Sequence, residues 1–482
     1  MRMKTGGKPN IIFVVVDALR PKNLGCYGYG KNISPNIDGI SKQGLLFWDA
    51  YSTTNTTDPS LTTIFSGRFG RSHGIMEHGA LLQSEEVMNY LKTVRTLPEI
   101  LKGNGYKTFA LDWLGRWHTK GYDYYSGILR AESRWGEKLT YGQTRGHAER
   151  KPRRGLLKYL PLIMSRISSL VKKPHIIPRT DIYGDAAIVT QKAIDIIKEN
   201  LEHNFFLFIH YWDTHFPYNN PGGAEETHAR PDRSSREQLK RVKHRGRDKQ
   251  IQLLGGIERV LAMYDGSIAL VDQEIGKLVA ALTDLGILEN SLIILTADHG
   301  ESLTEHDIYF DHHGLYNETI HVPLILRYAG LPQGKVVKGF VQHPDIMPTI
   351  LDIVGVKSEE DYDGRSLMPL ICRNEQINPT IYAEETHSEV KQLVATPEYK
   401  YISAPSAEDA VCKYCHMIHG GVEELYDLAA DPTEMVNVVN KHPAEAEKLK
   451  NALAQRIKNF EKKRERLKLK GKIQVLKQQS GI

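Results

Sequence analysis

Cysteine is scarce in this sequence, and a strong excess of charge of either sign is absent. Only four cysteines occur in 482 residues, which is too few for a disulfide framework and typical of a reducing compartment. The 63 lysines and arginines are nearly balanced by 58 aspartates and glutamates, and so small a difference does not indicate a nucleic-acid-binding protein. We therefore expect a cytoplasmic protein that binds no nucleic acid, and the mild positive charge is compatible with an anionic substrate.

Long apolar runs are also missing. The first run, residues 11–16, ends at Asp17 before it reaches the length of a signal-peptide core. The most apolar later segment, residues 155–171, is interrupted by Lys158 and Arg166, whereas a transmembrane helix needs an unbroken apolar span. We predict no transmembrane segment, although residues 155–171 are compatible with a peripheral position on a membrane surface.

The composition is that of an ordinary globular protein. Hydrophobic residues make up 40% and charged residues 25% of the chain, which argues against a disordered or fibrous protein. Because single hydrophobic cores rarely grow beyond about 250–300 residues, we expect one large domain and a smaller one.

Short apolar runs alternate with amphipathic stretches over most of the chain. This rhythm is typical of a parallel α/β sheet sandwiched between helices. Residues 257–282 form one of the amphipathic stretches and are predicted to be a helix. The runs that we interpret as buried strands are residues 11–16, 107–111, 205–210 and 292–297.

Two basic segments, residues 141–179 and 219–249, interrupt this rhythm. We interpret them as solvated surface insertions, with a polyanion or membrane contact as the alternative. After about residue 375 the pattern changes to short strands and turns, and it closes with a charged helix from Pro443 to roughly Lys470. We therefore predict a large α/β domain over residues 1–375 and an α+β subdomain with a small antiparallel sheet over residues 376–482.

Carboxylate, imidazole and guanidinium side chains follow the predicted strands. Ligands of open α/β sheets bind beyond the carboxyl ends of the strands, so these residues are the first candidates for a site. Asp17, Asp298 and His299 offer two oxygen donors and one nitrogen donor, a set that suits one divalent metal ion, manganese or zinc somewhat better than calcium. The full set comprises Asp17, Arg116, His118, Asp213, His215, Asp298 and His299.

Thr57 begins a segment with the features of a helix start. We interpret Asp58 as the N-cap, Pro59 as a residue of the first turn and Gly67 as the C-terminal stop. Thr57 would then face the positive end of a helix dipole, where backbone N–H groups bind anionic oxygens. A metal ion bound to its hydroxyl would lower the hydroxyl pKa and make it a nucleophile, so we predict Thr57 as a further metal ligand. Without the metal, Thr57 would be a simple cap residue.

Several motifs resemble, in their order along the chain, those of the sulfatases of the alkaline phosphatase superfamily. Thr57–Arg68 resembles the Cys-x-Pro-x-Arg signature, and Gly115–His118 resembles the Gly-Lys-Trp-His segment. His215–Tyr218 resembles the substrate-histidine motif, and Asp298–Glu301 the metal motif. The resemblance implies an alkaline-phosphatase-like sheet with a smaller C-terminal sheet and helix. It also covers Pro35–Asp38, Gly44–Phe47, Leu315–Glu318, Val322–Ile325, Asp363–Leu367 and Glu424–Leu428.

The chain departs from the sulfatase pattern at the nucleophile and around it. Thr57 stands where the family has the cysteine that becomes formylglycine, so no formylglycine is expected. Leu61 replaces the signature arginine, Ala18 the second aspartate of the usual pair, and Arg116 the usual lysine. Because a threonine ester must be hydrolysed or passed to an acceptor, the chain is also similar to the phosphoethanolamine and phosphoglycerol transferases of the superfamily.

The residues and the resemblance together predict a metal-dependent hydrolase of sulfate or phosphate esters, with a small molecule or a saccharide as substrate. As a hypothesis, the metal and Arg116 hold the nonbridging oxygens, Thr57 attacks in line, and His118 or His215 protonates the leaving oxygen. A phosphotransferase and a non-catalytic anion-binding relative are the alternative functions. The sequence gives no indication of the oligomeric state.

Histidines later in the sequence extend the candidate site. His312 or His313 matches the position of a late lysine of the family and is a candidate contact of the substrate anion, with a structural hydrogen bond as the alternative. A second metal ion, as in alkaline phosphatases, would need another cluster of ligands. Asp213, His215 and residues 311–313 supply the atoms for it but no recognisable spacing.

Cys412, Cys415 and His416 match the spacing of a c-type haem attachment motif. Haem attachment needs export, and we predict no signal peptide. We interpret the two cysteines as ordinary thiols, and a local zinc clip with His419 is the alternative.

Overall fold

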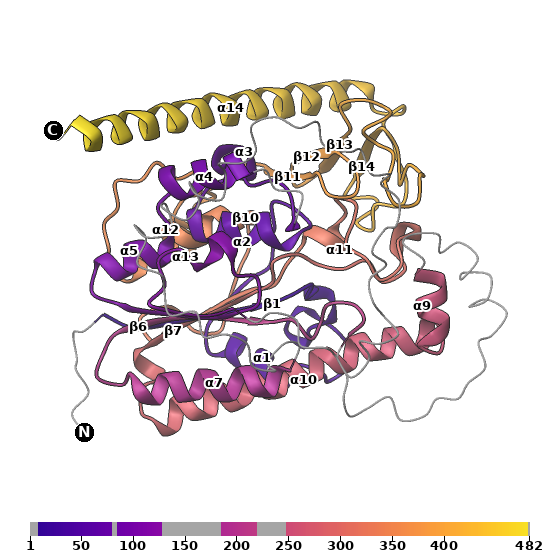
Figure 1. Ribbon diagram of the computed structural model, residues 1–482. Coiled ribbons are helices and arrows are strands. Elements are labelled where there is room, and N and C mark those ends of the chain that lie inside the picture. Colours follow the sequence, from indigo (N-terminus) through magenta and orange to yellow (C-terminus); the bar gives the residue numbers. More distant parts are fainter. Residues whose placement is uncertain (1–7, 80–83, 128–184, 219–246, 481–482) are drawn as a thin grey trace, which may run out of the picture.

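Figure 1 shows the computed structural model of the protein, which describes residues 8–79, 84–127, 185–218 and 247–480, with side chains to residue 469. The predicted insertion at residues 141–179 lies outside the described residues. The same holds for residues 219–246 of the second predicted insertion, while its last residues begin the helix α9 (Arg247–Leu253). The interpretation of both segments as surface insertions therefore stays a prediction.

An eight-stranded sheet lies at the centre of the large α/β layer, in the order β5-β4-β6-β1-β7-β8-β2-β9. Strand β1 (Asn10–Val16) pairs in parallel with β6 (Phe205–Tyr211) and β7 (Ser291–Thr296). Every residue of these three strands is buried, as expected for a sheet that is covered on both faces. The others are β4 (Lys107–Asp112), β5 (Tyr124–Gly127), β2 (Leu45–Phe47), β9 (Lys335–Val337) and β8 (Leu324–Arg327).

The predicted α/β fold with a parallel or mixed sheet is confirmed. Only β8 runs antiparallel to its neighbours, β7 and β2, among the described strand pairs of this sheet. A short parallel pair, β3 (Ala50–Tyr51) and β10 (Val341–Gln342), lies apart from it.

Helices cover both faces of the large sheet (Figure 1). One face carries α1 (Pro35–Lys42), α7 (Ala186–Glu199) and α10 (Ile257–Asp284). The opposite face carries α2 (Thr57–Ser66), α5 (Leu97–Gly103) and α12 (His343–Ile353). Among the described residues, no helix is both long enough and apolar enough to cross a membrane. Shorter helices are α3 (Gly70–His73), α4 (Ser84–Thr93), α11 (Asn317–Ile320) and α13 (Met368–Arg373).

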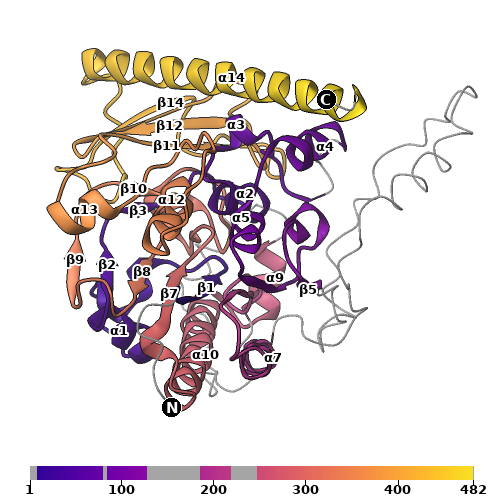
Figure 2. The same ribbon diagram turned by 90° about the vertical axis from the view of Figure 1, so that its left-hand side faces the viewer.

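A four-stranded antiparallel sheet follows in the C-terminal part. It consists of β11 (Ile381–Glu385), β12 (Lys391–Ala395), β13 (Tyr399–Ser403) and β14 (Glu423–Asp427). The long helix α14 (Pro443–Ser480) lies across this sheet and continues over α3 and α4 (Figure 2). It runs beyond the predicted end near Lys470, because Gly471 weakens a helix by only about 0.5–1 kcal/mol relative to alanine and does not stop it.

Candidate active site

Three residues from two neighbouring strands meet at the carboxyl edge of the large sheet. Asp17 directly follows β1, and Asp298 and His299 follow β7. The parallel register of these strands pairs Val15 with Thr296, so the residues after both strands lie side by side. One ligand atom from each of Asp17, Asp298 and His299 lies within 4.8 Å of the others. The structure thus brings together the three residues that the sequence predicts as a metal-binding set.

The donor atoms of this group are arranged as a cation would require. All three side chains are fully buried, and neither Asp17 oxygen nor Oδ2 of Asp298 has a hydrogen-bond partner among the described residues. Buried anionic oxygens without partners are costly. The Nδ1 atom of His299 lies 2.8 Å from the Gly300 carbonyl oxygen, to which it donates, so Nε2 keeps its lone pair. The residues present therefore fit a divalent metal ion.

Electrostatics distinguish the two carboxylates of the group. Burial raises the pKa of Asp17, but His210, His215 and His299 outweigh burial and hold it below its ordinary value. Burial and the neighbouring Asp17 raise the pKa of Asp298 above its ordinary value. Two carboxylates this close to each other favour a bound cation, because it relieves their mutual repulsion.

Thr57 lies beside this group at the start of α2. Its Oγ1 atom is 3.4 Å from Nε2 of His299, and the side chain is buried. The prediction that Asp58 is the N-cap is wrong, because the cap position belongs to Thr56, which has an extended backbone and no side-chain capping bond. The Asp58 carboxylate is engaged elsewhere. Thr57 is consequently the first residue of the helix.

Asp58 contacts Arg116 and His118, two residues that the sequence analysis placed near the substrate. Nη2 of Arg116 lies 2.6 and 2.8 Å from its two oxygens, and Nε2 of His118 lies 3.1 Å from Oδ1. His78 adds a contact of 3.0 Å. Burial raises the pKa of Asp58, but His78 and His118 outweigh it and hold the pKa well below the ordinary value. Arg116 and His118 therefore contact Asp58, the residue after Thr57, and do not belong to the metal-binding group.

His215 and His312 belong to a series of neighbouring rings that leads from Trp212 to His299 of the metal-binding group. The ring of His215 stacks on Trp212 at 4.0 Å and lies 5.7 Å from the His312 ring, which is 4.3 Å from that of His299. Nδ1 of His215 donates to the Phe216 carbonyl oxygen at 2.7 Å. Burial lowers the pKa of His215 to about 4, so its ring is neutral near pH 7 and its Nε2 is an acceptor.

His313 does not join these residues. Its Nδ1 atom lies 3.7 Å from Oδ1 of Asp311, and its ring is 4.6 Å from that of His419 in the C-terminal part. Asp213 accepts a hydrogen bond from the Ala186 N–H at 3.2 Å. Among the described residues, these side chains form no group of three or more metal-ligand atoms, so the two-metal alternative gains no support.

Two residues behind Asp17 were missed by reasoning from the sequence. His210, in β6, lies 2.8 Å from Oδ1 of Asp112 through Nδ1 and 3.6 Å from Oδ2 of Asp17 through Nε2. Burial lowers the pKa of His210, but the two carboxylates outweigh burial and raise it to about 10. Asp112 is the last residue of β4, one residue beyond the end of the predicted strand. A prediction that extended the strand by one residue would have included Asp112 among the residues at the carboxyl edge of the sheet.

Ala18, which stands where the family has an aspartate, contributes through its backbone. It adopts a left-handed conformation with φ of 56°, in which its N–H donates to Oδ1 of Asp298 at 3.1 Å. Its carbonyl oxygen accepts the Tyr264 hydroxyl at 2.8 Å. Leu61, at the place of the signature arginine, is fully buried in the apolar core. The first departure thus supports the group through its main chain, and the second places an apolar side chain in the core.

Two family models match the chain. The model for "Sulfatase" covers residues 9–356, and the model for "N-sulphoglucosamine sulphohydrolase, C-terminal" covers residues 304–463. The first therefore includes Asp17, Thr57, Asp298 and His299, and the second includes the four-stranded sheet and most of α14.

Similar proteins extend over nearly the whole chain. An N-acetylglucosamine-6-O-sulfatase of Bacteroides thetaiotaomicron is 25% identical over 94% of this chain and 86% of its own length. The structure of BT4656 with its substrate D-glucosamine-2-N,6-O-disulfate aligns with a TM-score of 0.61 at 21% identity, over 95% of this chain and 98% of the other. The phosphonate monoester hydrolase of Agrobacterium radiobacter aligns with a TM-score of 0.66 at 19% identity, over 94% and 96%. The structural likenesses establish the common fold.

Proposed function

Because the chain belongs to the sulfatase family and is a sulfatase-like ester hydrolase, we propose that it acts with one divalent metal ion and with Thr57 as its nucleophile. One observation carries this proposal. The Thr57 hydroxyl, at the first residue of α2, lies 3.4 Å from Nε2 of His299 in a group whose buried oxygens lack hydrogen-bond partners among the described residues. A hydroxyl in this place can serve as the last ligand of a cation and as the attacking atom.

Asp17, Asp298, His299 and Thr57 would hold the metal ion. The ion would lower the pKa of the Thr57 hydroxyl and polarise the ester oxygen. The mixed oxygen and nitrogen donors suit manganese or zinc somewhat better than calcium. The start of α2 adds the positive end of the helix dipole, which favours the anionic group of the ester.

Three histidines have different proposed roles at the site. His118 presents a proton on Nε2, because its partner Asp58 is held ionised and can only accept. We assign to it the protonation of the leaving oxygen. His215 donates through Nδ1 to a backbone carbonyl, so its Nε2 accepts a proton or a hydrogen bond. His312, whose ring contacts that of His299, is placed to contact the substrate anion.

Arg116 forms an ion pair with Asp58. Its guanidinium lies on Asp58 and stacks over the Trp117 ring at 4.7 Å. A substrate oxygen that binds Arg116 must therefore share it with Asp58, which lowers the net positive charge offered to the substrate. We propose Arg116 as a substrate contact whose charge Asp58 moderates.

The chemistry of Thr57 bears on how the ester is cleaved and on which esters are candidate substrates. A threonine ester lacks the hydrate oxygen through which formylglycine expels sulfate, so it must be cleaved by water or passed to an acceptor. Similarity to a glucosamine disulfate-binding protein and to a phosphonate monoester hydrolase supports two classes of substrate, a saccharide sulfate and a phosphate or phosphonate ester. A phosphotransferase is the second candidate function, because Thr57 matches the nucleophile of such enzymes.

A substrate screen with Thr57 variants tests the proposal. We expect the purified chain to cleave an aryl sulfate, a phosphate monoester or a phosphate diester in the presence of manganese, zinc or calcium. Thr57→Ala should lower kcat by about 1,000-fold or more, whereas Thr57→Ser, which keeps a hydroxyl, should retain measurable turnover. Thr433→Ala, at an exposed position, is the control.

Each outcome of the screen has a definite meaning. Activity that survives Thr57→Ala would exclude Thr57 as the nucleophile. Transfer of the phosphoryl group to added glycerol or ethanolamine, in preference to water, would identify a phosphotransferase. Anion binding without turnover of any substrate would favour a non-catalytic relative.

A further inference from the structure

A tight loop in the C-terminal part brings together two cysteines and a histidine outside the candidate active site. An isolated bridge between Val411 and Ile418 closes the loop. Within it, the Cys412 N–H donates to the Met417 carbonyl oxygen at 2.8 Å, and the His416 N–H donates to the Cys412 carbonyl oxygen at 2.8 Å. The backbone therefore fixes the relative positions of the side chains that the loop carries.

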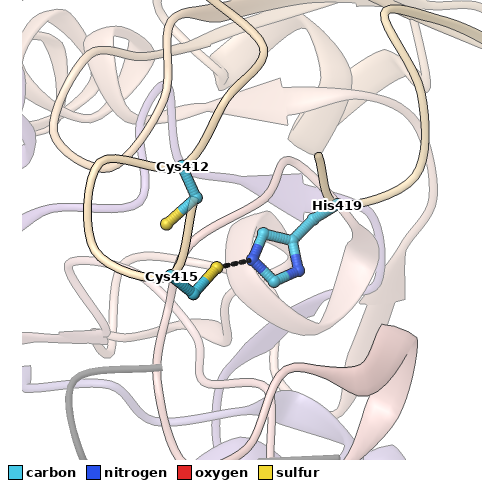
Figure 3. A group of neighbouring side chains, drawn as sticks. All are labelled: Cys412, Cys415 and His419. Atoms are coloured by element: carbon cyan, nitrogen blue, oxygen red, sulfur yellow. Dashed lines mark hydrogen bonds between the residues drawn. The ribbon is translucent and has the colours of Figure 1, made fainter. Parts of the chain in front are cut away.

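Cys415 and His419 point toward each other, and Cys412 lies beside them (Figure 3). Sγ of Cys415 lies 3.1 Å from Nε2 of His419, and one ligand atom of each of the three side chains lies within 4.8 Å of the others. Both cysteines are free thiols, and Cys412 and His419 are buried. His416, which completes the haem-like pattern in the sequence, is exposed and outside the group.

The spacing of the donors suits a small tetrahedral ion. With Zn–S near 2.3 Å and Zn–N near 2.0–2.1 Å, ligand atoms around tetrahedral zinc lie roughly 3.5–4 Å apart. The Cys415 and His419 donors at 3.1 Å must move slightly apart to reach this, and all three ligand atoms already lie within 4.8 Å of one another. Its sulfur donors are soft and prefer zinc, while the carboxylates beside Thr57 are hard, so the two groups differ in the metals they favour.

We propose that Cys412, Cys415 and His419 bind a zinc ion that locks this loop. Three protein ligands leave the fourth position to water. The site is separate from the group of Asp17, Asp298 and His299, and it does not depend on the function proposed for Thr57.

The surroundings of the loop fit such a role. The ammonium group of Lys391 donates to the His419 carbonyl oxygen at 2.5 Å and lies 2.9 Å from Glu424, so the backbone next to the histidine is already anchored. Burial lowers the pKa of His419 to about 3, and the ring is neutral as a ligand must be. Zinc binding would displace the two thiol protons to solvent.

The zinc loop would also support the active site from outside. The His419 ring lies 4.6 Å from the ring of His313, and the neighbouring His312 contacts the ring of His299. A fixed loop therefore limits the movement of residues 312–313. In the proposed function His312 contacts the substrate anion rather than the reacting atoms, so loss of zinc should raise KM more than it lowers kcat.

Cobalt substitution of the full chain separates the two metal sites. Cobalt bound to thiolates gives sulfur-to-metal charge-transfer absorption, and cobalt bound to carboxylate and imidazole does not. We expect this absorption in the reduced protein, and we expect zinc to abolish it by displacement. Cys415→Ser should lower it by about half, because one of two thiolates is lost, and Cys412→Ser/Cys415→Ser should remove it together with one bound zinc ion per chain.

Matched variants keep the test decisive. Cys26→Ser and Cys372→Ser change the remaining free cysteines and should leave the absorption unchanged, while His419→Gln should weaken zinc binding without removing a thiol. Absence of charge transfer in the reduced wild-type protein would overturn the proposal. So would absorption that persists in the double variant, or a thiol titration that finds Cys412 and Cys415 joined as a disulfide.

Discussion

At the level of single residues, a buried histidine, His210, lies next to Asp17. His210 lies between Asp112 and Asp17, with contacts of 2.8 and 3.6 Å, and its ring stacks against Trp113 at 6.4 Å between centroids. The His210 ring therefore borders one side of the Asp17 carboxylate. Residues that orient a metal ligand in this way commonly contribute as much to metal affinity as a ligand does.

We predict that His210→Gln weakens manganese binding by about 10–100-fold, the range found for residues that orient metal ligands. The glutamine keeps a polar group but cannot bridge both carboxylates as a charged ring. Titration calorimetry with manganese measures the change, and manganese is chosen because it avoids thiolates. His203→Gln, at an exposed position just before β6, is the control. Unchanged affinity in His210→Gln would mean that Asp17 is held by its strand alone.

Some of these residues were accessible from the sequence and others were not. Asp17, Asp298 and His299 were predictable because they directly follow buried strands, and a parallel sheet gathers such residues at one edge. The role of Asp58 was not, since it depends on Arg116 and His118, which approach from a 3-10 helix after β4 and show no spacing relation to Asp58. Which of these residues act in catalysis stays a prediction.

At the level of elements, α2 determines where Thr57 stands. All ten of its residues are buried, because the helix lies between the sheet and the C-terminal part. Gly67 ends it in a left-handed conformation with φ of 63°, as the sequence predicted. Its carbonyl oxygen accepts the N–H groups of Asp363 and Gly364 at 2.9 and 3.1 Å.

We predict that Gly67→Ala lowers the free energy of unfolding by about 1–2 kcal/mol for the backbone conformation alone, with a further loss from crowding. A Cβ atom at this position would lie 2.9 Å from Cδ1 of Tyr362. Gly28→Ala is the control, because Gly28 also has a positive φ but has nothing within 4 Å of its Cβ position. Urea unfolding measures both. Equal losses in the two variants would show that Tyr362 moves aside at no cost.

At the level of the whole molecule, the central strands, the small antiparallel sheet and the start of the terminal helix at Pro443 were predictable, and the short outer strands of the large sheet were not. Continuous apolar runs identified β1, β4, β6 and β7, since a strand buried on both faces must be apolar throughout. The strands β2, β8 and β9 are three to four residues long, too short to give a periodic signal. The predicted domain boundary near residue 375 stays a prediction, although the four-stranded sheet begins at Ile381.

The helix α14 joins the C-terminal sheet to the segment after α2 through a small aromatic cluster. Phe460 lies 4.8 Å from the ring of Phe69, which follows α2, and 5.1 Å from that of Tyr382, which belongs to β11. Arg456 adds cation–π contacts to the same rings, at 5.2 Å from Phe69 and 5.7 Å from Tyr382. One side chain thus contacts both the C-terminal sheet and the segment that follows α2.

We predict that Phe460→Ala lowers the free energy of unfolding by about 3–5 kcal/mol, the usual cost of removing a buried phenylalanine. The side chain is only 7% exposed, so solvent cannot fill the space freely. Lys462→Ala, two residues further along the same helix and exposed, should change stability by less than about 0.5 kcal/mol. Chemical denaturation followed by fluorescence measures both variants.

If α14 holds the sheets together, Phe460→Ala should also make the C-terminal part unfold before the large sheet, seen as two transitions in place of one. A single transition with a loss no larger than that of Lys462→Ala would mean that the helix rests on the surface without supporting it.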